Sequence, residues 1–293
     1  LDLDATDYIF YGNGAERFKI ASDGSLSTPT AGTSNVRFGV NAGNSIASGG
    51  NYNTVVGDEA GTAITTSDNN TFMGYAAGDA TTTGNSNTAI GRLALSTNTT
   101  GAENTAVGVN ALYLATTGTF NVAIGNSAGG AVTTGVQNTL IGGLAGDSLT
   151  DADYNIALGY AALSSDTLGS RSVAIGRNAL LSQNFSSATA SNNTAVGYEV
   201  GRNTTIGIDN SLFGSNAGYA LTDSDGNVAV GRSALATDTL GHSSTAIGTW
   251  ALQNQNFTSA TASYNVAVGY SAGNDITTGT NNTIIGGLSG DAI

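Results

Sequence analysis

Few residues of this chain could do chemistry, and the single histidine, His242, comes first among them. A histidine can act as a general acid or base near neutral pH, or bind a metal through a ring nitrogen. The sequence around this position occurs twice in the chain, and the counterpart of His242 in the earlier copy is Ser170. Because an otherwise matching copy lacks the imidazole, we expect His242 to be a surface loop residue without a chemical role.

Two acidic segments have the alternating oxygen ligands of a calcium-binding loop: Asp151-Ala152-Asp153-Tyr154-Asn155 and Asp223-Ser224-Asp225-Gly226-Asn227. Both lack the Gly at the sixth position and the Glu at the twelfth that complete an EF-hand. The nonapeptide repeat of calcium-binding β-rolls is also missing. We therefore expect these aspartates to cap turns, and we predict neither a metal ion nor a cofactor.

Other catalytic and binding patterns are missing from the sequence. The glycine-rich stretch 142–146 has no Lys-Ser or Lys-Thr to make it a phosphate-binding loop, and no Ser-His-Asp set or acid pair stands apart. The net charge is −13, and the eight Lys and Arg are spread singly, which argues against nucleic-acid binding. The chain has no Cys and no run of 18 apolar residues. We predict a protein that is not an enzyme and does not insert into a membrane.

A short repeat organises most of the chain, and it must position every candidate residue. Each copy ends an Asn-Thr-Ala-Ile-Gly-like unit with a glycine, here called the marker glycine. From one marker to the next, the position number rises by 18, then seven times by 17, then by 21, three times by 17, by 21 and by 17. The marker glycines are Gly39, Gly57, Gly74, Gly91, Gly108, Gly125, Gly142, Gly159, Gly176, Gly197, Gly214, Gly231, Gly248, Gly269 and Gly286. This spacing predicts an all-β fold, a parallel β-solenoid or β-roll of about fifteen 17-residue coils.

The three residues before each marker glycine predict a short strand that is apolar on both faces. We expect the first and third positions, such as Val122 and Ile124, to line the coil interior. The middle position is alanine in nine coils, and one thin coil cannot bury both faces. We therefore expect the middle column to form an interface between copies of the chain. Its alanines are Ala89, Ala106, Ala123, Ala157, Ala174, Ala195, Ala229, Ala246 and Ala267.

Two further columns and two insertions complete the repeat. Asn begins the strand in thirteen coils, which predicts a ladder of amide hydrogen bonds along the stack. Four positions after the marker, pairs of Gly and pairs of Leu alternate, giving a super-repeat of four coils. Matching insertions fall near residues 181–192 and 253–264. Their aromatic residues, Phe185 and Phe257, are candidates for receptor contact; alternatively, they fold back over the coil edge.

We divide the chain into a small N-terminal β-hairpin module with a linker, residues 1–32, and a solenoid shaft, residues 33–293. The first segment contains Tyr8-Ile9-Phe10-Tyr11 and Phe18-Lys19-Ile20, followed by an Asp23-Gly24 turn that predicts a hairpin. At about 4.8 Å per coil, the shaft would be a rod of about 70 Å. Since the last residues repeat an internal segment, we expect a piece of a longer protein.

The repeat resembles two families of extended surface proteins. Asn87-Thr88-Ala89-Ile90-Gly91 and Ser172-Val173-Ala174-Ile175-Gly176 look like the head repeats of trimeric autotransporter adhesins. The longer form, with Ala-Leu and Thr-Thr-Gly, resembles repeats of bacteriophage tail fibres, and Glu16-Arg17-Phe18-Lys19-Ile20 is similar to a segment that precedes them. The resemblance covers residues 33–293 and implies a left-handed β-roll, a homotrimer and attachment to a host cell. The 17-residue period departs from the adhesin pattern.

From this resemblance we expect the structural shaft of a trimeric viral tail fibre, located in the virion. Its partners would be other fibre or tail proteins and a host cell-surface receptor or glycan. The alternative is a bacterial trimeric surface adhesin or extracellular filament. A third possibility, an ice-binding or pectin-degrading solenoid, is disfavoured because the threonine pairs are adjacent, as in Thr82-Thr83, and clustered acids are missing.

Overall fold

The computed structural model describes residues 8–20, 26–28 and 30–290, which form β-strands and turns and contain no helix. The chain divides into two compact units, Leu1–Asn121 and Val122–Ile293. Both are built from parallel β-solenoid coils, about fifteen in all, and most residues that pair between successive strands differ by 17 in position. The predicted fold class is therefore confirmed.

The first unit begins with a three-stranded antiparallel sheet and continues as a solenoid. The sheet consists of β1 (Tyr8–Gly12), β2 (Ala15–Ile20) and β3 (Leu26–Ser27). The predicted Asp23-Gly24 turn and Pro29 lie outside the described residues. Five parallel strands follow in sequence order, namely β4 (Val36–Phe38), β5 (Thr54–Val56), β6 (Thr71–Met73), β7 (Thr88–Ile90) and β8 (Thr105–Val107).

The second unit contains ten further three-residue strands that pair in parallel, coil to coil. They are β9 (Val122–Ile124), β10 (Thr139–Ile141), β11 (Ile156–Leu158), β13 (Val173–Ile175), β15 (Thr194–Val196), β16 (Ser211–Phe213), β17 (Val228–Val230), β19 (Thr245–Ile247), β21 (Val266–Val268) and β22 (Thr283–Ile285).

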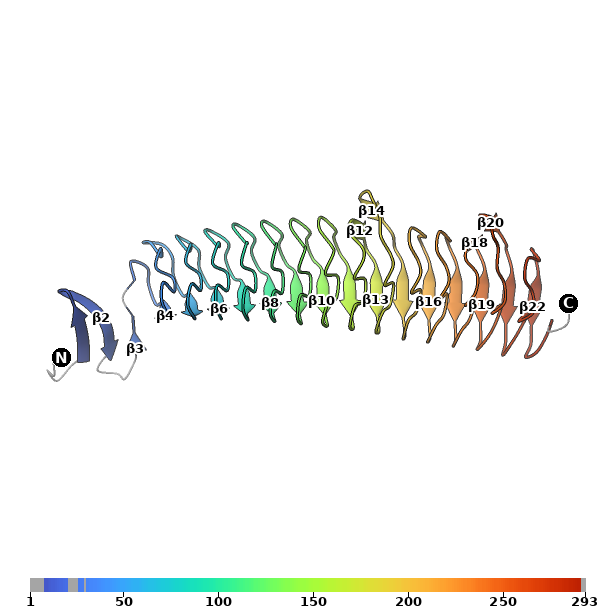
Figure 1. Cartoon of the computed structure of the whole chain (residues 1–293), viewed down its shortest axis with the longest axis horizontal. Helices are drawn as coiled ribbons and strands as arrows, with labels where there is room; N and C mark the ends of the chain where they lie inside the picture. Colours follow the sequence, from blue (N-terminus) through green and yellow to red (C-terminus); the bar gives the residue numbers. More distant parts are fainter. Residues whose placement is uncertain (1–7, 21–25, 29, 291–293) are drawn as a thin grey trace. The chain divides into compact units, whose positions relative to one another are not determined.

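The two insertions each add a small parallel ladder to the second unit. In the first insertion, β12 (Gly169–Ser170) pairs with β14 (Thr189–Ala190). In the second, β18 (Gly241–His242) pairs with β20 (Thr261–Ala262). Figure 1 shows β14 and β20 on the side of the coils away from β13 and β19. The insertions therefore rise from the back of the coils, opposite the main strands.

The strands face the opposite way from the prediction. The middle residue points into the coil: Ala89 and Ala123 have no exposed surface, whereas Ile90 and Ile124 are 38% and 39% exposed. All nine alanines proposed as an interface are fully buried within the single chain. The physical reason is space, since a 17-residue coil is so narrow that its interior admits one strand side chain per coil. The alanine column is therefore core, and the predicted interface on it is wrong.

Gly and Leu alternate four positions after the marker glycine, and this alternation balances the volume of the side chains that fill the core. Leu180 is fully buried in a coil whose middle strand residue is Ala174. Where the column carries Gly201 instead, a Cβ at that position would lie 2.8 Å from Cδ1 of Leu212 and 2.9 Å from Cδ2 of Leu180. Both residue types have positive φ here, 49° at Leu180 and 54° at Gly201. Glycine thus leaves room for large side chains from neighbouring coils, which keeps the interior close-packed.

The asparagine column forms the predicted hydrogen-bond ladder. Oδ1 of Asn87 accepts the backbone N–H of Asn104 at 3.0 Å, and its Nδ2 donates to the carbonyl oxygen of Gly101 at 2.9 Å. In the second unit, Oδ1 of Asn210 accepts the N–H of Asn227 at 3.0 Å, while its Nδ2 donates to Ser224. These side chains are fully buried. The ladder therefore satisfies backbone groups at a corner that water does not reach.

Candidate functional site

The outward positions of the three-residue strands form an uncharged, largely apolar surface, which we call the outer strand face. It consists of the first and third residues of each strand, such as Val122 and Ile124. The third residue of each strand is apolar, and the first is Val, Ile, Thr or Ser. Across the described three-residue strands from β4 to β22, neither outward position holds a charged residue. The largest exposed members in the second unit include Ile124, Ile141, Ile156, Phe213, Val230 and Ile247, and those in the first unit include Met73 and Ile90. An apolar surface that repeats from coil to coil is typical of an interaction site.

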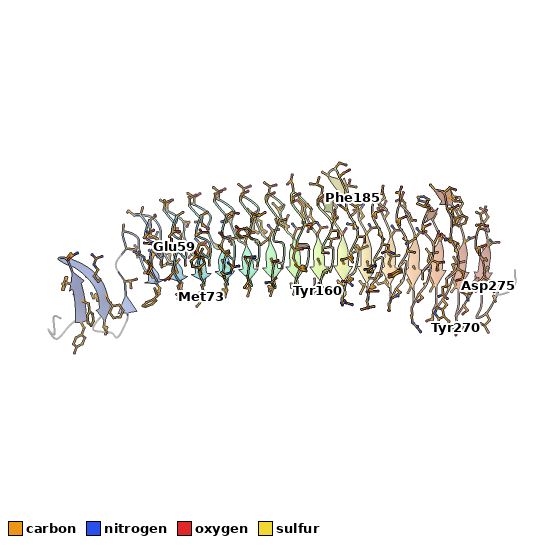
Figure 2. All side chains as sticks on the ribbon, viewed as in Figure 1. Glu59, Met73, Tyr160, Phe185, Tyr270 and Asp275 are labelled. Atoms are coloured by element: carbon orange, nitrogen blue, oxygen red, sulfur yellow. The ribbon has the colours of Figure 1, made fainter. Side chains whose placement is uncertain are left out.

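In the second unit, a row of aromatic and arginine side chains, called the aromatic row, runs beside the outer strand face. Its members lie one or two positions after the marker glycines. Figure 2 shows two of its members, Tyr160 and Tyr270, on the strand side of the coils. The guanidinium of Arg177 lies 5.7 Å from the ring centre of Tyr198, and its Nη1 donates to the tyrosine oxygen at 3.1 Å. Farther along, Arg232 lies 5.5 Å from the ring centre of Trp250.

Trp250 in turn packs edge-on against Tyr270, at 5.2 Å between ring centres. Tyrosine, tryptophan and arginine are the residues that protein interfaces enrich. The sequence carried a signal for this row, because Tyr160, Tyr198 and Tyr270 each directly follow a marker glycine. Sequence reasoning missed it because the tyrosines were not placed in register with the repeat.

The insertion phenylalanines do not form a contact surface. Phe185 and Phe257 are each 5% exposed, so the prediction that they contact a receptor is wrong. The ring of Phe185 packs where a side chain on Gly169 would lie, 2.8 Å from a Cβ there, and Phe257 packs in the same way on Gly241. Each ring therefore folds back over the coil edge and fixes its insertion, which was the alternative interpretation.

A buried carboxylate holds the start of each insertion. Asp166 is fully buried and accepts hydrogen bonds from Nε2 of Gln183 at 2.6 Å and from the N–H of Gly169 at 3.0 Å. It also accepts the N–H of Phe185 at 3.3 Å. A buried charge requires such donors, since its desolvation is otherwise unfavourable. The insertion is thus tied to the solenoid at both its aromatic ring and its backbone.

The same glutamine repairs the ladder where serine replaces asparagine. At Ser172 the side chain is too short to continue the ladder, and Nε2 of Gln183 donates to its hydroxyl at 2.8 Å. Oε1 of Gln183 accepts from Nδ2 of Asn193 at 2.9 Å, which reconnects the next coil. The second insertion repeats these contacts with Asp238, Gln255, Ser244 and Asn265. The two insertions are therefore built on one frame.

His242 makes a hydrogen bond that supports the fold. It lies in β18, and its Nδ1 accepts the backbone N–H of Asp225 at 3.0 Å. Ser170 occupies the matching place, where its hydroxyl accepts the N–H of Asp153 at 3.0 Å. The side chain of His242 is 20% exposed, so the expectation of a surface loop residue is corrected. The imidazole stands in for a hydroxyl that accepts one hydrogen bond.

The aspartates of the two calcium-like segments accept hydrogen bonds from the preceding coil, 17 positions away, and so link successive coils. Oδ1 of Asp153 accepts the N–H of Val136, and Oδ1 of Asp225 accepts that of Ile208, both at 2.8 Å. Asp151 accepts the hydroxyl of Thr134. Within residues 8–20, 26–28 and 30–290, no three His, Cys, Asp or Glu side chains cluster in a way that would hold a metal ion.

Two half-buried aspartates lie apart from these surfaces, one in each unit. Burial raises the pKa of Asp79, and hydrogen bonds from Ser96 and the backbone oppose that rise. Burial likewise raises the pKa of Asp147. One oxygen of each carboxylate is buried without a hydrogen-bond partner among the described residues. Both carboxylates are therefore weak points of the fold when charged.

Comparison with known proteins adds no relative to these observations. No family model, curated protein or solved structure matches this chain. In the part of the chain that the structure describes, no helix is long and apolar enough to cross a membrane. The candidate sites therefore rest on the geometry alone, namely the outer strand face, the aromatic row and the two insertions.

Proposed function

We propose that parallel copies of this chain associate through the outer strand face to form the shaft of a trimeric bacteriophage tail fibre. The observation that carries this proposal is the uncharged apolar surface on the three-residue strands from β4 to β22. A chain with a net charge of −13 as a whole repels its own copies. Association through an uncharged face removes apolar area from water without bringing like charges together.

A copy of the same chain fits this face better than an unrelated partner. The outer residues recur once per coil, and an in-register copy presents the same residues at the same interval. Ile124 and Ile141 of one chain would therefore meet equivalent residues in its neighbours, coil for coil. The stoichiometry of three chains and the role in host attachment come from a resemblance to trimeric fibres and adhesins. The repeats that carry this resemblance include Asn87-Thr88-Ala89-Ile90-Gly91.

The test is the mass of the assembly in solution, measured by light scattering after size-exclusion chromatography. We expect a trimer from the unmodified chain. The triple variant Ile124→Lys, Ile141→Lys and Ile247→Lys should yield folded monomers, with the β-sheet circular dichroism retained. The matched control, Ser165→Lys, Ser187→Lys and Ser259→Lys, adds the same charge at exposed positions away from the strands and should remain trimeric.

A folded monomer from the unmodified chain would overturn the proposal, as would a trimer that tolerates all three lysines on the strand face. Ala123→Arg separates the two possible interfaces, because Ala123 is fully buried in its own coil. This variant should unfold the coils rather than dissociate intact chains. For the viral role, antibodies against this chain should label the tail fibres of the phage particles that encode it.

A further inference from the structure

A shallow groove lies beside the first insertion, at the back of the coils. Its lining includes Asp153, Tyr154, Ser170 and Arg171 on one side and residues 188–190 of the insertion on the other. The volume is about 210 Å³, smaller than the roughly 300–1,000 Å³ of pockets that enclose drug-sized ligands. The groove is therefore suited to one ring of a longer molecule.

The groove has a rigid frame. The N–H of Arg171 donates to the carbonyl oxygen of Asp153 at 3.0 Å, and the N–H of Asp153 donates to the hydroxyl of Ser170. On the insertion side, the N–H of Thr189 donates to Leu168 at 3.2 Å and its hydroxyl donates to Ser187 at 3.0 Å. Such preorganisation lowers the entropy that a ligand loses on binding.

The groove presents free polar groups next to an exposed aromatic ring. Tyr154 is 50% exposed, and Arg171 is also exposed. Among the described residues, the guanidinium of Arg171 has no hydrogen-bond or ion-pair partner, and neither has Oδ2 of Asp153. An arginine fork binds a carboxylate in bidentate geometry, and a carboxylate oxygen accepts hydrogen bonds from hydroxyls. The tyrosine offers a flat apolar surface with a polar edge.

We infer that this groove binds a carboxylated saccharide, such as a uronic or sialic acid residue of a surface glycan. The sugar ring packs on Tyr154, its carboxylate pairs with Arg171, and a hydroxyl donates to Asp153. This inference rests on the proposed function, because it supplies the attachment partner of the fibre. It assigns the contact to the coil residues beside the insertion, while the buried Phe185 only supports the insertion.

The second insertion is a built-in control, since it repeats the frame without the ligand-binding side chains. Ser243 donates its N–H to the carbonyl oxygen of Asp225 at 3.0 Å, as Arg171 does to Asp153. Tyr154 corresponds to Gly226 and Arg171 to Ser243, and all four have φ near 60°. The residues can therefore be exchanged between the two copies without a change of backbone conformation, because each replacement already has this φ in the other copy.

The experiment measures binding of sialyllactose and oligogalacturonate to the full chain, with lactose as the neutral probe. The unmodified chain should bind at least one acidic probe, with one site per chain, and bind lactose more weakly. The double variant Tyr154→Gly and Arg171→Ser should lose at least about tenfold in affinity. The triple variant Gly226→Tyr, Ser243→Arg and His242→Ser should gain a second site per chain.

Binding of neither acidic probe by the unmodified chain would overturn the inference, as would unchanged affinity in the double variant. Equal affinity for lactose would overturn the role of the carboxylate. The mass of each variant is measured in parallel. A trimer that binds no acidic saccharide contradicts this inference alone, whereas a monomer that binds through Tyr154 and Arg171 contradicts only the proposed fibre.

Discussion

Leu212 occupies the space that a side chain on Gly201 would need, since a Cβ there would lie 2.8 Å from Cδ1 of the leucine. The two residues belong to successive coils, so core volume is shared between coils as well as within each coil. Gly146 shows the same relationship within one coil, where its missing side chain is replaced by Leu140 and Leu149. The super-repeat is therefore a packing pattern.

This relationship predicts that the two positions are energetically coupled. Leu212→Ala should lower the free energy of unfolding by about 2–5 kcal/mol, because it leaves a cavity. Gly201→Leu should also destabilise, because two leucines would compete for one space. The double variant recreates the arrangement at Leu180, where the strand of the following coil carries Ala195, so its loss should be smaller than the sum by about 1–3 kcal/mol.

Denaturant unfolding of the two single variants and the double variant measures this coupling. The control pairs Leu212→Ala with Gly146→Leu, which lies several coils away, and should be additive within about 0.5 kcal/mol. Additivity of the Gly201 and Leu212 changes would refute shared volume between coils.

The asparagine ladder predicts that removing a single side-chain amide lowers the free energy of unfolding. Asn87→Ala removes the acceptor for the N–H of Asn104 and leaves that backbone group buried without a partner, whereas the carbonyl oxygen of Gly101 keeps the side-chain amide of Asn98. At about 1–3 kcal/mol for one such group, the loss in unfolding free energy should be about 1–3 kcal/mol. Urea unfolding followed by circular dichroism measures it. The exposed neighbour is the control, and Ser86→Ala should change stability by less than about 0.5 kcal/mol. Similar midpoints for the two variants would show that the ladder contributes nothing.

Burial of Asp147 predicts a pH dependence with a definite sign. Because its pKa is raised in the folded chain above the usual value of 3.8, the native state holds this proton over a range where the unfolded chain has lost it. Stability from this group therefore falls as the pH rises through that range. Asp147→Asn should stabilise the protein at pH 7, by less than about 1 kcal/mol because water screens a half-exposed group.

Urea midpoints at pH 3 and pH 7 test this prediction. The gain should disappear at pH 3, where the carboxyl is protonated in both states. The exposed Asp275, replaced by asparagine, is the control and should show no gain at pH 7. A loss of stability at pH 7 in Asp147→Asn would mean that the charged carboxylate is favourable in the fold.

The sequence alone determined the period of the coils, the position of the three-residue strand before each marker glycine and the asparagine ladder. These properties follow from spacing, because stacked coils place identical residues in register whatever the cross-section of the coil. Even the insertions were found in this way, because they form a matching pair at equivalent places in two copies of the super-repeat.

Only the tertiary structure decided which strand face is core. Neither face is charged along most of the stack, and a closed coil buries only one of them, which proves to be the middle position of Ala123, while Ile124 points outward. Likewise, the burial of Phe185 depends on the folded chain. The space beside Gly169 that holds its ring exists only after the insertion folds back. The groove of Tyr154 and Arg171 likewise depends on residues of three coils meeting in space, which spacing along the chain does not reveal.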